Sequence, residues 1–579
     1  MPNMIQNAKD SISQIFNAAY QKAAEKGELP AGAALSGTVE IPKDSANGDF
    51  AANHAMAGAK ALHMAPRKIA EALIANADLA DTWFASVEVA GPGFINFRLA
   101  DRWYADVLKA VTQEGSDYGR SDIGHGQKVM VEFVSANPTG PMHMGNARGG
   151  VLGDALASVL DRAGYQVWRE FYVNDAGNQI EKFANSIDAR YQQLLLGEDQ
   201  VAFPEDGYHG DDIKDLAQLF YEANGDRYLT VPVAERHQAM AEFGLQRNIP
   251  KMQEDLRRYG IVYDQWFFES ELHESGYVAE SVQKLTDRGY TYEKDGALWL
   301  KTSQILTEQL RKAGKKQEEI DKLDLKDDVL RRANGFYTYF AADIAYHRNK
   351  LEKRGFDKVI NVWGADHHGH VARLKGAMDA LGLDGEHRLD IVLMQLVKLT
   401  RNGEVVRMSK RTGKAISLTD LLDEIPVDAA RYFFNSRPES PVEFDLELAI
   451  RQDSENPVYY VQYAHARICT LLSALAAEGH TVPASADAAL LSTAEEKELI
   501  KQLAALPEEI RLAARDYDPS RINRYVTELA ARFHRFYTVC RIKGAESDVQ
   551  AARLLLADCV RRVIAVSLGI IGVTAPEKM

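Results

Sequence analysis

Hydrophobic residues in the middle of the chain follow two alternating periods. Between about 120 and 425, short runs rich in β-branched and aromatic residues alternate with amphipathic stretches of helical spacing; the runs are KVMVEFV, YQVWREFYV, KVINVWG and LDIVLMQLVKL. Such alternation is typical of a mainly parallel, doubly wound sheet with helices on both faces. The pattern predicts a Rossmann-type α/β domain over residues 119–426.

The flanking regions have different patterns. Residues 1–118 combine a helical stretch at 53–75 with two strand-like runs that meet at Gly91-Pro92-Gly93, which predicts a small α+β domain. Residues 427–579 keep helical spacing almost throughout and predict an all-α domain. The interval from about 185 to 335 is polar, helix-rich and too long for a crossover, so we expect a helical insertion there.

Composition narrows the class of protein. With 579 residues and 46% hydrophobic content the chain can bury several cores, and its longest apolar run, 563–573, is too short to cross a bilayer. We expect a cytoplasmic protein without a membrane segment. The three cysteines lack CxxC spacing, so neither a disulfide framework nor a cysteine zinc site is indicated. The net charge of -15 argues against indiscriminate polyanion binding but leaves local basic patches open.

The stretch VEFVSANPTGPMHMGNARGG, residues 131–150, places a polar loop between a strand and a helix. Open α/β sheets bind ligands at the carboxyl ends of their strands, and a helix N-terminus favours phosphate. His143 and Asn146 stand at the helix start, with Gly145 between them to allow close approach of an anion. From these residues alone, phosphate binding and simple helix capping are equally good explanations of His143. No G-x-G-x-x-G fingerprint is present.

A second polar segment, VVRMSKRTGKAISLTDLLDE, carries several basic residues beside glycine and serine. Together with the HMGN helix start, its RMSK sequence resembles the two ATP-binding motifs of class I aminoacyl-tRNA synthetases, known as HIGH and KMSK. This chain has asparagine for the last histidine of the first motif and arginine for the first lysine of the second. The resemblance implies catalytic roles for His143, Asn146, Arg407, Ser409 and Lys410. It implies ATP contacts by Ala136, Asn137, Pro138, Thr139, Gly140, Pro141, Met142, His143, Met144, Gly145, Asn146 and Met408.

Further segments resemble one family of that class, the arginyl-tRNA synthetases of bacterial type. They are EFVSANPTGPMHMGNARGGVLGD, REFYVNDAGNQI, FPEDGYHGD, YFAADIAYHRNK, NVWGADHHGH and NPVYYVQYAHARI, in order through nearly the whole chain. The resemblance implies ATP-dependent activation of L-arginine to arginyl-adenylate and transfer to the terminal adenosine of tRNA(Arg), with release of AMP and pyrophosphate. It implies ATP with magnesium, no zinc, and arginine activation that depends on tRNA. We expect a monomer.

An arginine site needs acceptors, because the guanidinium is a permanent planar cation with five donors. The resemblance places Glu132, Asn137, Tyr339, Asp343 and Asp366 near the amino acid. Glu132 interrupts an apolar strand, and a buried carboxylate is costly without a partner. Bound arginine is one such partner; the ordinary alternative is that Glu132 lies on an exposed face of the strand.

Two surfaces are candidates for tRNA contact. In GPGFINFRL, strand alternation puts Phe94, Asn96 and Arg98 on one face, which suits an unstacked base, although an ordinary edge strand has the same spacing. After Asn456-Pro457, the residues Tyr460, Tyr463 and Arg467 share a helix face, for which aromatic core packing is the ordinary explanation. The resemblance favours tRNA binding by Phe94, Asn96, Tyr460, Tyr463, Arg467 and Met579, with phosphate contacts from Arg521, Arg524, Arg532 and Arg535.

Two other function classes remain open at this point. Asp366, His367, His368 and His370 include possible metal ligands and suggest a metal-dependent phosphoesterase or hydrolase. Their closeness in sequence argues against one shared metal, and more distant ligands are not evident. A nonenzymatic RNA-binding relative is the other alternative, and the intact His143, Gly145, Ser409 and Lys410 argue against it.

Overall fold

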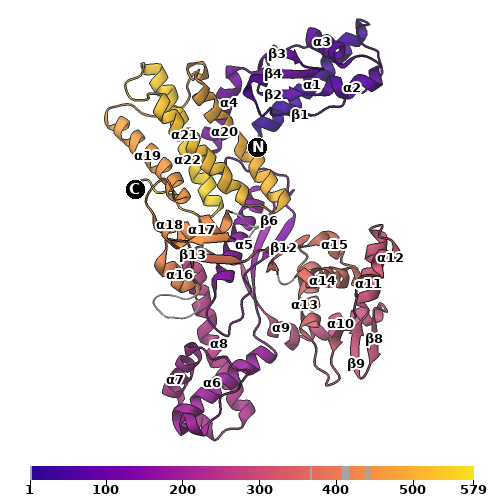
Figure 1. Ribbon diagram of the computed structural model, residues 1–579, viewed down its shortest axis with the longest axis vertical. Coiled ribbons are helices and arrows are strands. Elements are labelled where there is room, and N and C mark those ends of the chain that lie inside the picture. The colour runs from indigo at the N-terminus through magenta and orange to yellow at the C-terminus, as the bar shows by residue number, and fades with distance from the viewer. Residues whose placement is uncertain (1–2, 366–367, 407–415, 437–441) are drawn as a thin grey trace.

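The structure, a computed structural model, describes residues 3–365, 368–406, 416–436 and 442–579. In Figure 1 an α/β body occupies the centre of the molecule. A helical bundle and a small α+β domain lie above it, and further helical lobes project below it and to one side. The arrangement agrees with the predicted fold class.

Parallel strands form the central sheet, as the alternating pattern predicts. In spatial order they are β12 (Leu389–Met394), β11 (Lys358–Gly364), β5 (Lys128–Glu132), β6 (Gln166–Val173) and β7 (Gln265–Phe268). Helix α5 (Met144–Arg162) connects β5 to β6 and packs tightly on the sheet. A Cβ atom at Gly153 would lie 2.1 Å from Cγ of Phe133, so this close approach requires glycine.

The strand register brings three buried polar residues into one row. Glu132 of β5 lies between Glu170 of β6 and Asn361 of β11. Paired residues of neighbouring strands point to the same face of a sheet, so two carboxylates stand side by side. Like charges in this arrangement are destabilising unless nearby cations compensate them.

The interval 185–335, expected as one insertion, is divided by β7, which pairs with β6 in the central sheet. The four residues of β7 are too few for a periodic signal, which explains why the pattern missed it. The part of the chain before β7 forms a first lobe, which has its own core around Phe183, Tyr191 and Phe220. Its helices are α6 (Asn178–Leu196), α7 (Asp211–Asn224) and α8 (Val233–Arg258).

The second lobe follows β7 and contains the antiparallel sheet β10-β9-β8. Its elements are α9 (Glu269–Glu274), α10 (Tyr277–Asp287), β8 (Thr291–Lys294), β9 (Ala297–Leu300), α11 (Thr302–Lys312), α12 (Gln317–Ile320) and β10 (Asp328–Arg331). Helix α13 (Tyr339–Arg348) then returns to the central sheet and ends in one π-helical turn, Asn349–Lys353. Between β11 and β12 lie α14 (His368–Ala380) and α15 (Gly385–Arg388).

The run LDIVLMQLVKL, expected as one strand, forms two strands in different sheets. Its first part is β12, and its second part, β13 (Val397–Arg401), lies between β14 (Glu404–Val405) and β15 (Val442–Asp445). Three short helices accompany this smaller sheet: α16 (Leu418–Glu424), α17 (Val427–Asn435) and α18 (Leu446–Ile450). The strand β15 lies in a part of the chain expected to be purely helical.

The N-terminal domain is built on an antiparallel sheet in the order β1-β2-β4-β3. Strands β3 and β4 meet at Gly91-Pro92-Gly93, as predicted. The domain comprises α1 (Met4–Glu25), β1 (Val39–Glu40), β2 (Phe50–Ala52), α2 (His54–Leu62), α3 (Pro66–Asn76), β3 (Phe84–Ala90) and β4 (Phe94–Leu99). Helix α4 (Asp101–Glu114) leads from this domain to the C-terminal bundle and packs on two of its helices (Figure 1).

The C-terminal bundle has long amphipathic helices, namely α19 (Pro457–Ala477), α20 (Ala494–Asp516), α21 (Ser520–Val539) and α22 (Ser547–Ile570). Arg431 of α17 joins this end of the chain to the α/β body. It is fully buried, and its guanidinium donates to Asp154 of α5 at 2.5 Å and to the Ile571 carbonyl at 3.1 Å. Over the described residues, no helix is long and apolar enough to span a membrane.

Candidate active site

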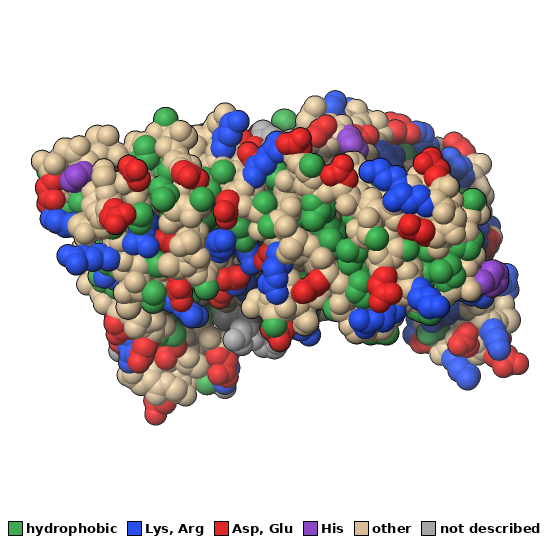
Figure 2. Space-filling view, turned by 90° about the horizontal axis from the view of Figure 1, so that it is seen from above, with side chains coloured by type: hydrophobic (Ala, Val, Ile, Leu, Met, Phe, Trp, Pro, Cys, Tyr) green, Lys and Arg blue, Asp and Glu red, His purple; other side chains and the backbone are tan. Residues whose placement is uncertain are grey.

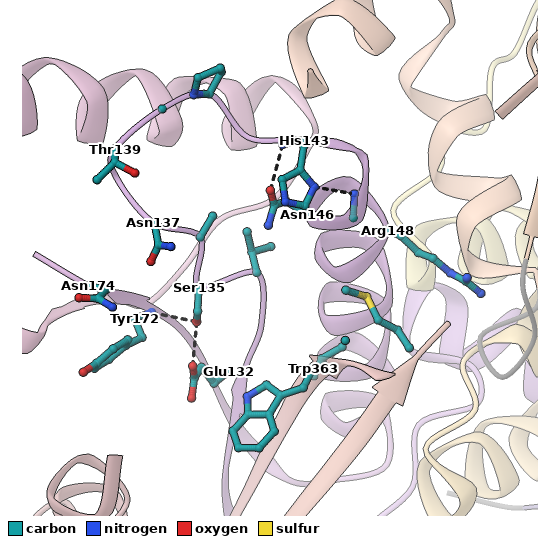
Figure 3. A pocket seen from close by; sticks show the side chains of 18 of the residues that line it. Glu132, Ser135, Asn137, Thr139, His143, Asn146, Arg148, Tyr172, Asn174 and Trp363 are labelled. Carbon is teal, nitrogen blue, oxygen red and sulfur yellow. Dashed lines mark hydrogen bonds between the residues drawn. The ribbon is translucent and has the colours of Figure 1, made fainter. Parts of the chain in front are cut away.

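A cavity of about 1110 Å³ opens at the carboxyl ends of β5, β6 and β11, where the doubly wound fold predicts a ligand site (Figure 3). Ten residues proposed from the sequence line it: Glu132, Ala136, Asn137, Thr139, Gly140, Pro141, His143, Gly145, Asn146 and Asp343. Met142 of the loop is instead buried, at 2% exposure, and Tyr339 is 44% exposed beside Gly177. Pro138 and Met144 are also absent from the cavity wall.

The start of α5 is a capping box that leaves two donors free. Nδ1 of His143, the N-cap, accepts from the Gly145 N–H at 3.1 Å, and Oδ1 of Asn146 accepts from the His143 N–H at 2.9 Å. Partial desolvation lowers the pKa of His143 below its ordinary value, which favours the neutral ring. Nε2–H of His143 and the NH₂ group of Asn146 therefore remain available at the cavity (Figure 3).

Capping and ligand binding are thus compatible at His143, because each uses a different ring nitrogen. Gly145 leaves room for the imidazole at this junction. A Cβ atom there would lie 3.0 Å from Cε1 of His143 and would displace the ring. The glycine predicted to admit an anion also preserves the imidazole position.

The loop between β5 and α5 has a strained start. Val134 and Ser135 adopt left-handed backbone conformations, with φ values of 71° and 43°, which are rare for residues other than glycine. The Ser135 hydroxyl secures this turn by donating to Oε1 of Glu132 at 2.8 Å and accepting from the Tyr172 N–H at 3.2 Å. Farther along, the Pro138 carbonyl accepts from the Asn248 amide of α8 at 2.8 Å. The first lobe therefore supports the loop.

Glu132 has a protein partner that the sequence did not suggest. Its Oε2 lies 2.5 Å from Nζ of Lys350, whose side chain is fully buried in the π-helical turn after α13. The ammonium also donates to Oδ1 of Asn361 at 3.3 Å and lies 3.9 Å from the centre of the Tyr346 ring. The expectation of a partner is confirmed, whereas an exposed strand face is wrong, because Glu132 is only 6% exposed.

Glu170, the neighbour of Glu132 in the sheet, is compensated in the same way. Arg354 Nη1 donates to its Oε1 at 2.9 Å, and the Tyr346 hydroxyl donates to the same oxygen at 2.6 Å. Two cations from the end of α13 therefore neutralise two adjacent carboxylates. A positional signal for this face exists in the sequence, since Asp343, His347 and Lys350 are spaced at i, i+4 and i+7.

His347 lies between these charges and is held neutral. Its Nδ1–H donates to the Asp343 carbonyl at 2.8 Å, so its Nε2 accepts from the Asn361 amide at 2.6 Å. Burial, and then the charge of Lys350, hold the pKa of His347 well below its ordinary value. The Asp343 side chain itself faces the cavity and accepts from Nε2 of His370 at 3.0 Å.

The first lobe adds residues that the sequence analysis did not assign. The residues that line the cavity from the FPEDGYHGDD segment and the start of α7 are Tyr208, His209, Gly210 and Asp212. An ideal Cβ on Gly140 would lie 3.5 Å from the Asp212 carboxylate, so the two segments are in contact. Other unpredicted lining residues are Arg148, Tyr172, Asn174, Tyr346, His347, Trp363, His370 and the segment 394–397.

Several predicted residues lie outside the described part of the chain. They are Asp366 and the RMSK residues Arg407, Met408, Ser409 and Lys410. The described segment that follows them is anchored to the site, because the Leu418 N–H donates to the Met142 carbonyl at 2.9 Å. Among described residues, no group of three histidine, cysteine or acidic side chains is placed to hold a metal ion.

Comparisons with known proteins match this architecture from end to end. Three family models match: arginyl tRNA synthetase N terminal domain at residues 7–99, tRNA synthetases class I (R), catalytic domain, at 107–442, and DALR anticodon binding domain at 461–579. The arginine–tRNA ligases of Acetivibrio thermocellus and Caldanaerobacter subterraneus are 52% and 54% identical, each over 100% of both chains. The chain belongs to the arginyl-tRNA synthetase family.

Solved structures show the same fold. The Thermus thermophilus arginyl-tRNA synthetase matches with a TM-score of 0.73 at 20% identity, over 99% of this chain and 100% of that one. The Plasmodium falciparum arginyl-tRNA synthetase matches with a TM-score of 0.69 at 17% identity, over 99% of both chains. Nothing in these comparisons supports the metal-dependent hydrolase alternative.

The two surfaces suggested for tRNA differ in exposure. On β4, Phe94 is 40% exposed but Asn96 is only 4% exposed, so the prediction that they share an open face is wrong for Asn96. The loop around Gly48 covers it, because a Cβ on Gly48 would lie 3.4 Å from Cβ of Asn96. Arg98 of the same strand donates to the Ala46 carbonyl of that loop at 2.9 Å.

On α19 the predicted face is partly open. Tyr463 is 41% exposed and stacks on Tyr459 and His534, with ring centres 6.1 and 6.0 Å apart. Arg467 lies over the Tyr537 ring of α21 at 4.1 Å. The Met579 side chain is 53% exposed, and the nearby tail is held because Nδ1 of His465 hydrogen-bonds the Pro576 carbonyl at 2.9 Å.

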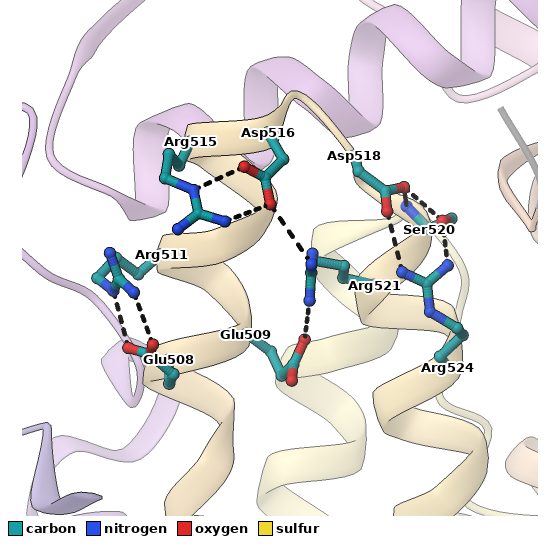
Figure 4. A network of polar contacts seen from close by, with 9 residues as sticks. All are labelled: Glu508, Glu509, Arg511, Arg515, Asp516, Asp518, Ser520, Arg521 and Arg524. Atoms are coloured by element: carbon teal, nitrogen blue, oxygen red, sulfur yellow. Dashed lines mark hydrogen bonds and ion pairs between the residues drawn. The ribbon is translucent and has the colours of Figure 1, made fainter. Parts of the chain in front are cut away.

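The arginines suggested for phosphate contact are all paired with carboxylates. Around the turn between α20 and α21, Arg521 pairs with Glu509 and Asp516, and Arg524 pairs with Asp518 (Figure 4). Arg532 and Arg535 pair with glutamates of the same bundle. Figure 2 shows basic and acidic side chains interspersed over the visible face rather than separated into regions. A phosphate at any of these arginines must therefore compete with a carboxylate.

Proposed function

We propose that this protein is an arginine–tRNA ligase, which activates L-arginine with ATP and transfers it to the terminal adenosine of tRNA(Arg), forming AMP and pyrophosphate. The observation that carries the proposal is identity above 50% to arginine–tRNA ligases over the full length of both chains. The cavity supports it, because phosphate donors at one end and carboxylates at the other suit ATP and arginine.

In the activation step, the arginine carboxylate attacks the α-phosphate of ATP and pyrophosphate leaves. Negative charge grows on the phosphate oxygens, so fixed donors aimed at them lower the barrier. We assign this role to Nε2–H of His143, the Asn146 amide and the N-terminus of α5. The capping box supports the assignment, since it fixes both side chains before ATP arrives.

For the RMSK segment we propose that Lys410, with Arg407 and Ser409, holds the departing pyrophosphate. Magnesium enters as part of the ATP substrate and screens the phosphate charges. The loop residues Asn137, Thr139 and Gly140 are proposed to contact ATP, together with the other loop residues assigned from the motif. We propose no zinc.

The arginine end of the cavity is assigned to Glu132, Asn137, Asp343 and Asp366. The charge of Glu132 is already neutralised by Lys350, whereas Asp343 bonds an imidazole. Of these two carboxylates, Asp343 is therefore the better partner for a guanidinium. Tyr339 remains proposed with less support, because it is 44% exposed and outside the cavity wall.

For tRNA we propose Phe94 on the N-terminal side, and Tyr460, Tyr463, Arg467 and Met579 on the bundle. We divide the chain into a tRNA-contacting domain at 1–118, a catalytic domain at 119–426 and an anticodon-binding domain at 427–579. We propose a monomer, and a cytoplasmic location because translation supplies its substrate there.

The testing experiment is exchange of labelled pyrophosphate into ATP with arginine present. One arm contains tRNA(Arg), one contains no RNA, and one contains tRNA(Arg) whose terminal ribose has been oxidised and cannot accept arginine. We expect exchange with either tRNA and little without, because tRNA binding energy would assemble the RMSK segment on the phosphates. Rapid exchange without RNA would contradict only the proposed dependence of arginine activation on tRNA. No exchange in any arm would contradict the proposed activity and favour the nonenzymatic alternative.

A further inference from the structure

The acidic residues of the cavity differ in how their charge is compensated. Among the described lining residues, Glu132 and Asp343 are the carboxylates at the sheet end, while Asp212 lies at the loop end beside Gly140. Glu132 forms an ion pair with a buried ammonium. The Asp343 side chain instead bonds an imidazole, that of His370, whose charge depends on its protonation. The state of that imidazole therefore decides how much negative charge Asp343 presents.

Arg373 fixes that state. Its Nη2 lies 3.2 Å from Nδ1 of His370, and a guanidinium can only donate, so Nδ1 must accept and carries no proton. The single proton of the neutral ring is then on Nε2, which donates to Oδ2 of Asp343 at 3.0 Å. His370 orients the carboxylate without cancelling its charge.

Arg373 is in turn held by Asp328 of β10. Its Nη1 donates to Oδ1 of Asp328 at 2.6 Å, and its guanidinium lies 5.5 Å from the centre of the Phe340 ring. The charges of Asp328 and Arg373 offset each other, and His370 is neutral. Across the four residues, one negative charge is left over, and it lies on Asp343.

Aromatic rings hold the imidazole in place. The Phe340 ring stands edge-on to His370 at 5.2 Å, and the Trp363 ring lies 5.7 Å away at a tilt of 35°. His370 is itself largely covered, with 19% of its side chain exposed, whereas 35% of the Asp343 side chain is exposed. The hydrogen-bonded chain thus ends at the cavity on Asp343, which is more accessible than His370.

We propose that His370, held by Arg373 and Asp328, is a positioning residue that aims the Asp343 carboxylate at the guanidinium of arginine and preserves its charge. The inference rests on the proposed function, because it names how that site selects a cation. His370 acts through Asp343 and need not touch the substrate. Arginine should therefore lose affinity when His370 is changed, while ATP should not.

The experiment is steady-state aminoacylation of tRNA(Arg) by full-length variants, with KM for arginine and for ATP measured separately. His370→Leu removes the donor, and we expect KM for arginine to rise at least about tenfold, as for loss of a charge-assisted bond, with kcat and KM for ATP within about threefold. His370→Gln can still donate near the Nε2 position and should stay within about threefold of wild type. Inhibition by citrulline, the neutral isostere of arginine, should change much less than KM for arginine.

Two further variants separate positioning from general damage. Arg373→Met, at a side chain 38% exposed, leaves His370 present but frees its Nδ1, and should also raise KM for arginine with kcat retained. His387→Leu is the matched control, because His387 bonds Asp384 at 2.7 Å in a similar pair but is 79% exposed and outside the cavity. It should leave every constant unchanged.

Wild-type KM for arginine in both His370→Leu and Arg373→Met would overturn the inference. Equal losses in kcat and in both KM values would also overturn it, since they indicate structural damage. If His370→Leu does not fold, Arg373→Met and His370→Gln decide the question. Failure of the wild-type protein to charge tRNA(Arg) with arginine would instead contradict the proposed function.

Discussion

The buried pair of Lys350 and Glu132 allows a quantitative test of how the site is built. Lys350→Met removes an ammonium that is fully buried and bonded to Glu132 at 2.5 Å and to Asn361 at 3.3 Å. Among the described residues, Glu132 then keeps the Ser135 hydroxyl as its hydrogen-bond donor, in a position 6% exposed. Removing one partner of such a pair costs about 3–5 kcal/mol, because the other charge stays buried without compensation.

The double variant Lys350→Met, Glu132→Gln removes both charges and should recover about 2 kcal/mol or more of that loss. The control is Lys358→Met, since Lys358 bonds Asp390 at 2.6 Å but is 32% exposed. It should cost less than about 1 kcal/mol, as exposed pairs do.

The measurement is urea unfolding followed by hydrogen exchange in peptides that cover β5 and α13. Exchange reports the local opening of the catalytic domain, whereas a global signal would mix several domains. We expect a coupling free energy above about 1.5 kcal/mol between positions 132 and 350. Additive effects of the two substitutions would refute the reasoning, since they would mean that each side chain is stabilised independently.

Three other predictions concern catalysis, RNA binding and pH. His143→Ala should slow single-turnover adenylate formation by about a hundredfold, because the proposed phosphate donor Nε2–H is lost. Its tRNA affinity should stay constant. An unchanged rate would contradict a catalytic role for His143. Phe94→Ala and Tyr463→Ala should each weaken tRNA binding by about 1–3 kcal/mol in a filter-binding titration, and unaltered binding in both would make these surfaces structural only. Burial, and then the charge of Lys350, lower the pKa of His347. Below about pH 6.5, its ordinary pKa, unfolding therefore takes up a proton at His347, and the stability of the fold decreases as the pH falls. The thermal midpoint should therefore drop less between pH 7.5 and pH 5.5 in His347→Gln than in wild type. Equal drops would contradict it.

Sequence patterns predicted the elements whose signal is local. The strand at Lys128–Glu132 and the helix from Met144 have clear periods, and the polar loop between them must lie at the edge of a parallel sheet. The part of the cavity around the start of α5 follows from those three facts. His143 was ambiguous because a cap and a ligand donor need the same residue at the same position. The structure shows that a ring which caps the helix through Nδ1 still has Nε2 available at the cavity.

Long-range partners could not be predicted in this way. Lys350 and Glu132 are 218 positions apart, and only the parallel register of β5 and β11, with the π-helical turn before β11, brings them together. The prediction that Asn96 lies on an open face was wrong for a related reason. Strand alternation predicts which residues share a face, but it cannot show that the loop at Gly48 covers that face.

The most direct test of the central claim is charging of purified tRNA with each amino acid in turn, using the full-length protein, ATP and magnesium. We expect stable aminoacyl-tRNA with arginine alone, because a site that satisfies the guanidinium's donors leaves unpaired carboxylates with any neutral side chain. Lysine should also be rejected, since a single ammonium cannot occupy the same planar set of acceptors. Charging with another amino acid at a comparable rate, or no charging with arginine, would contradict the assignment as an arginine–tRNA ligase.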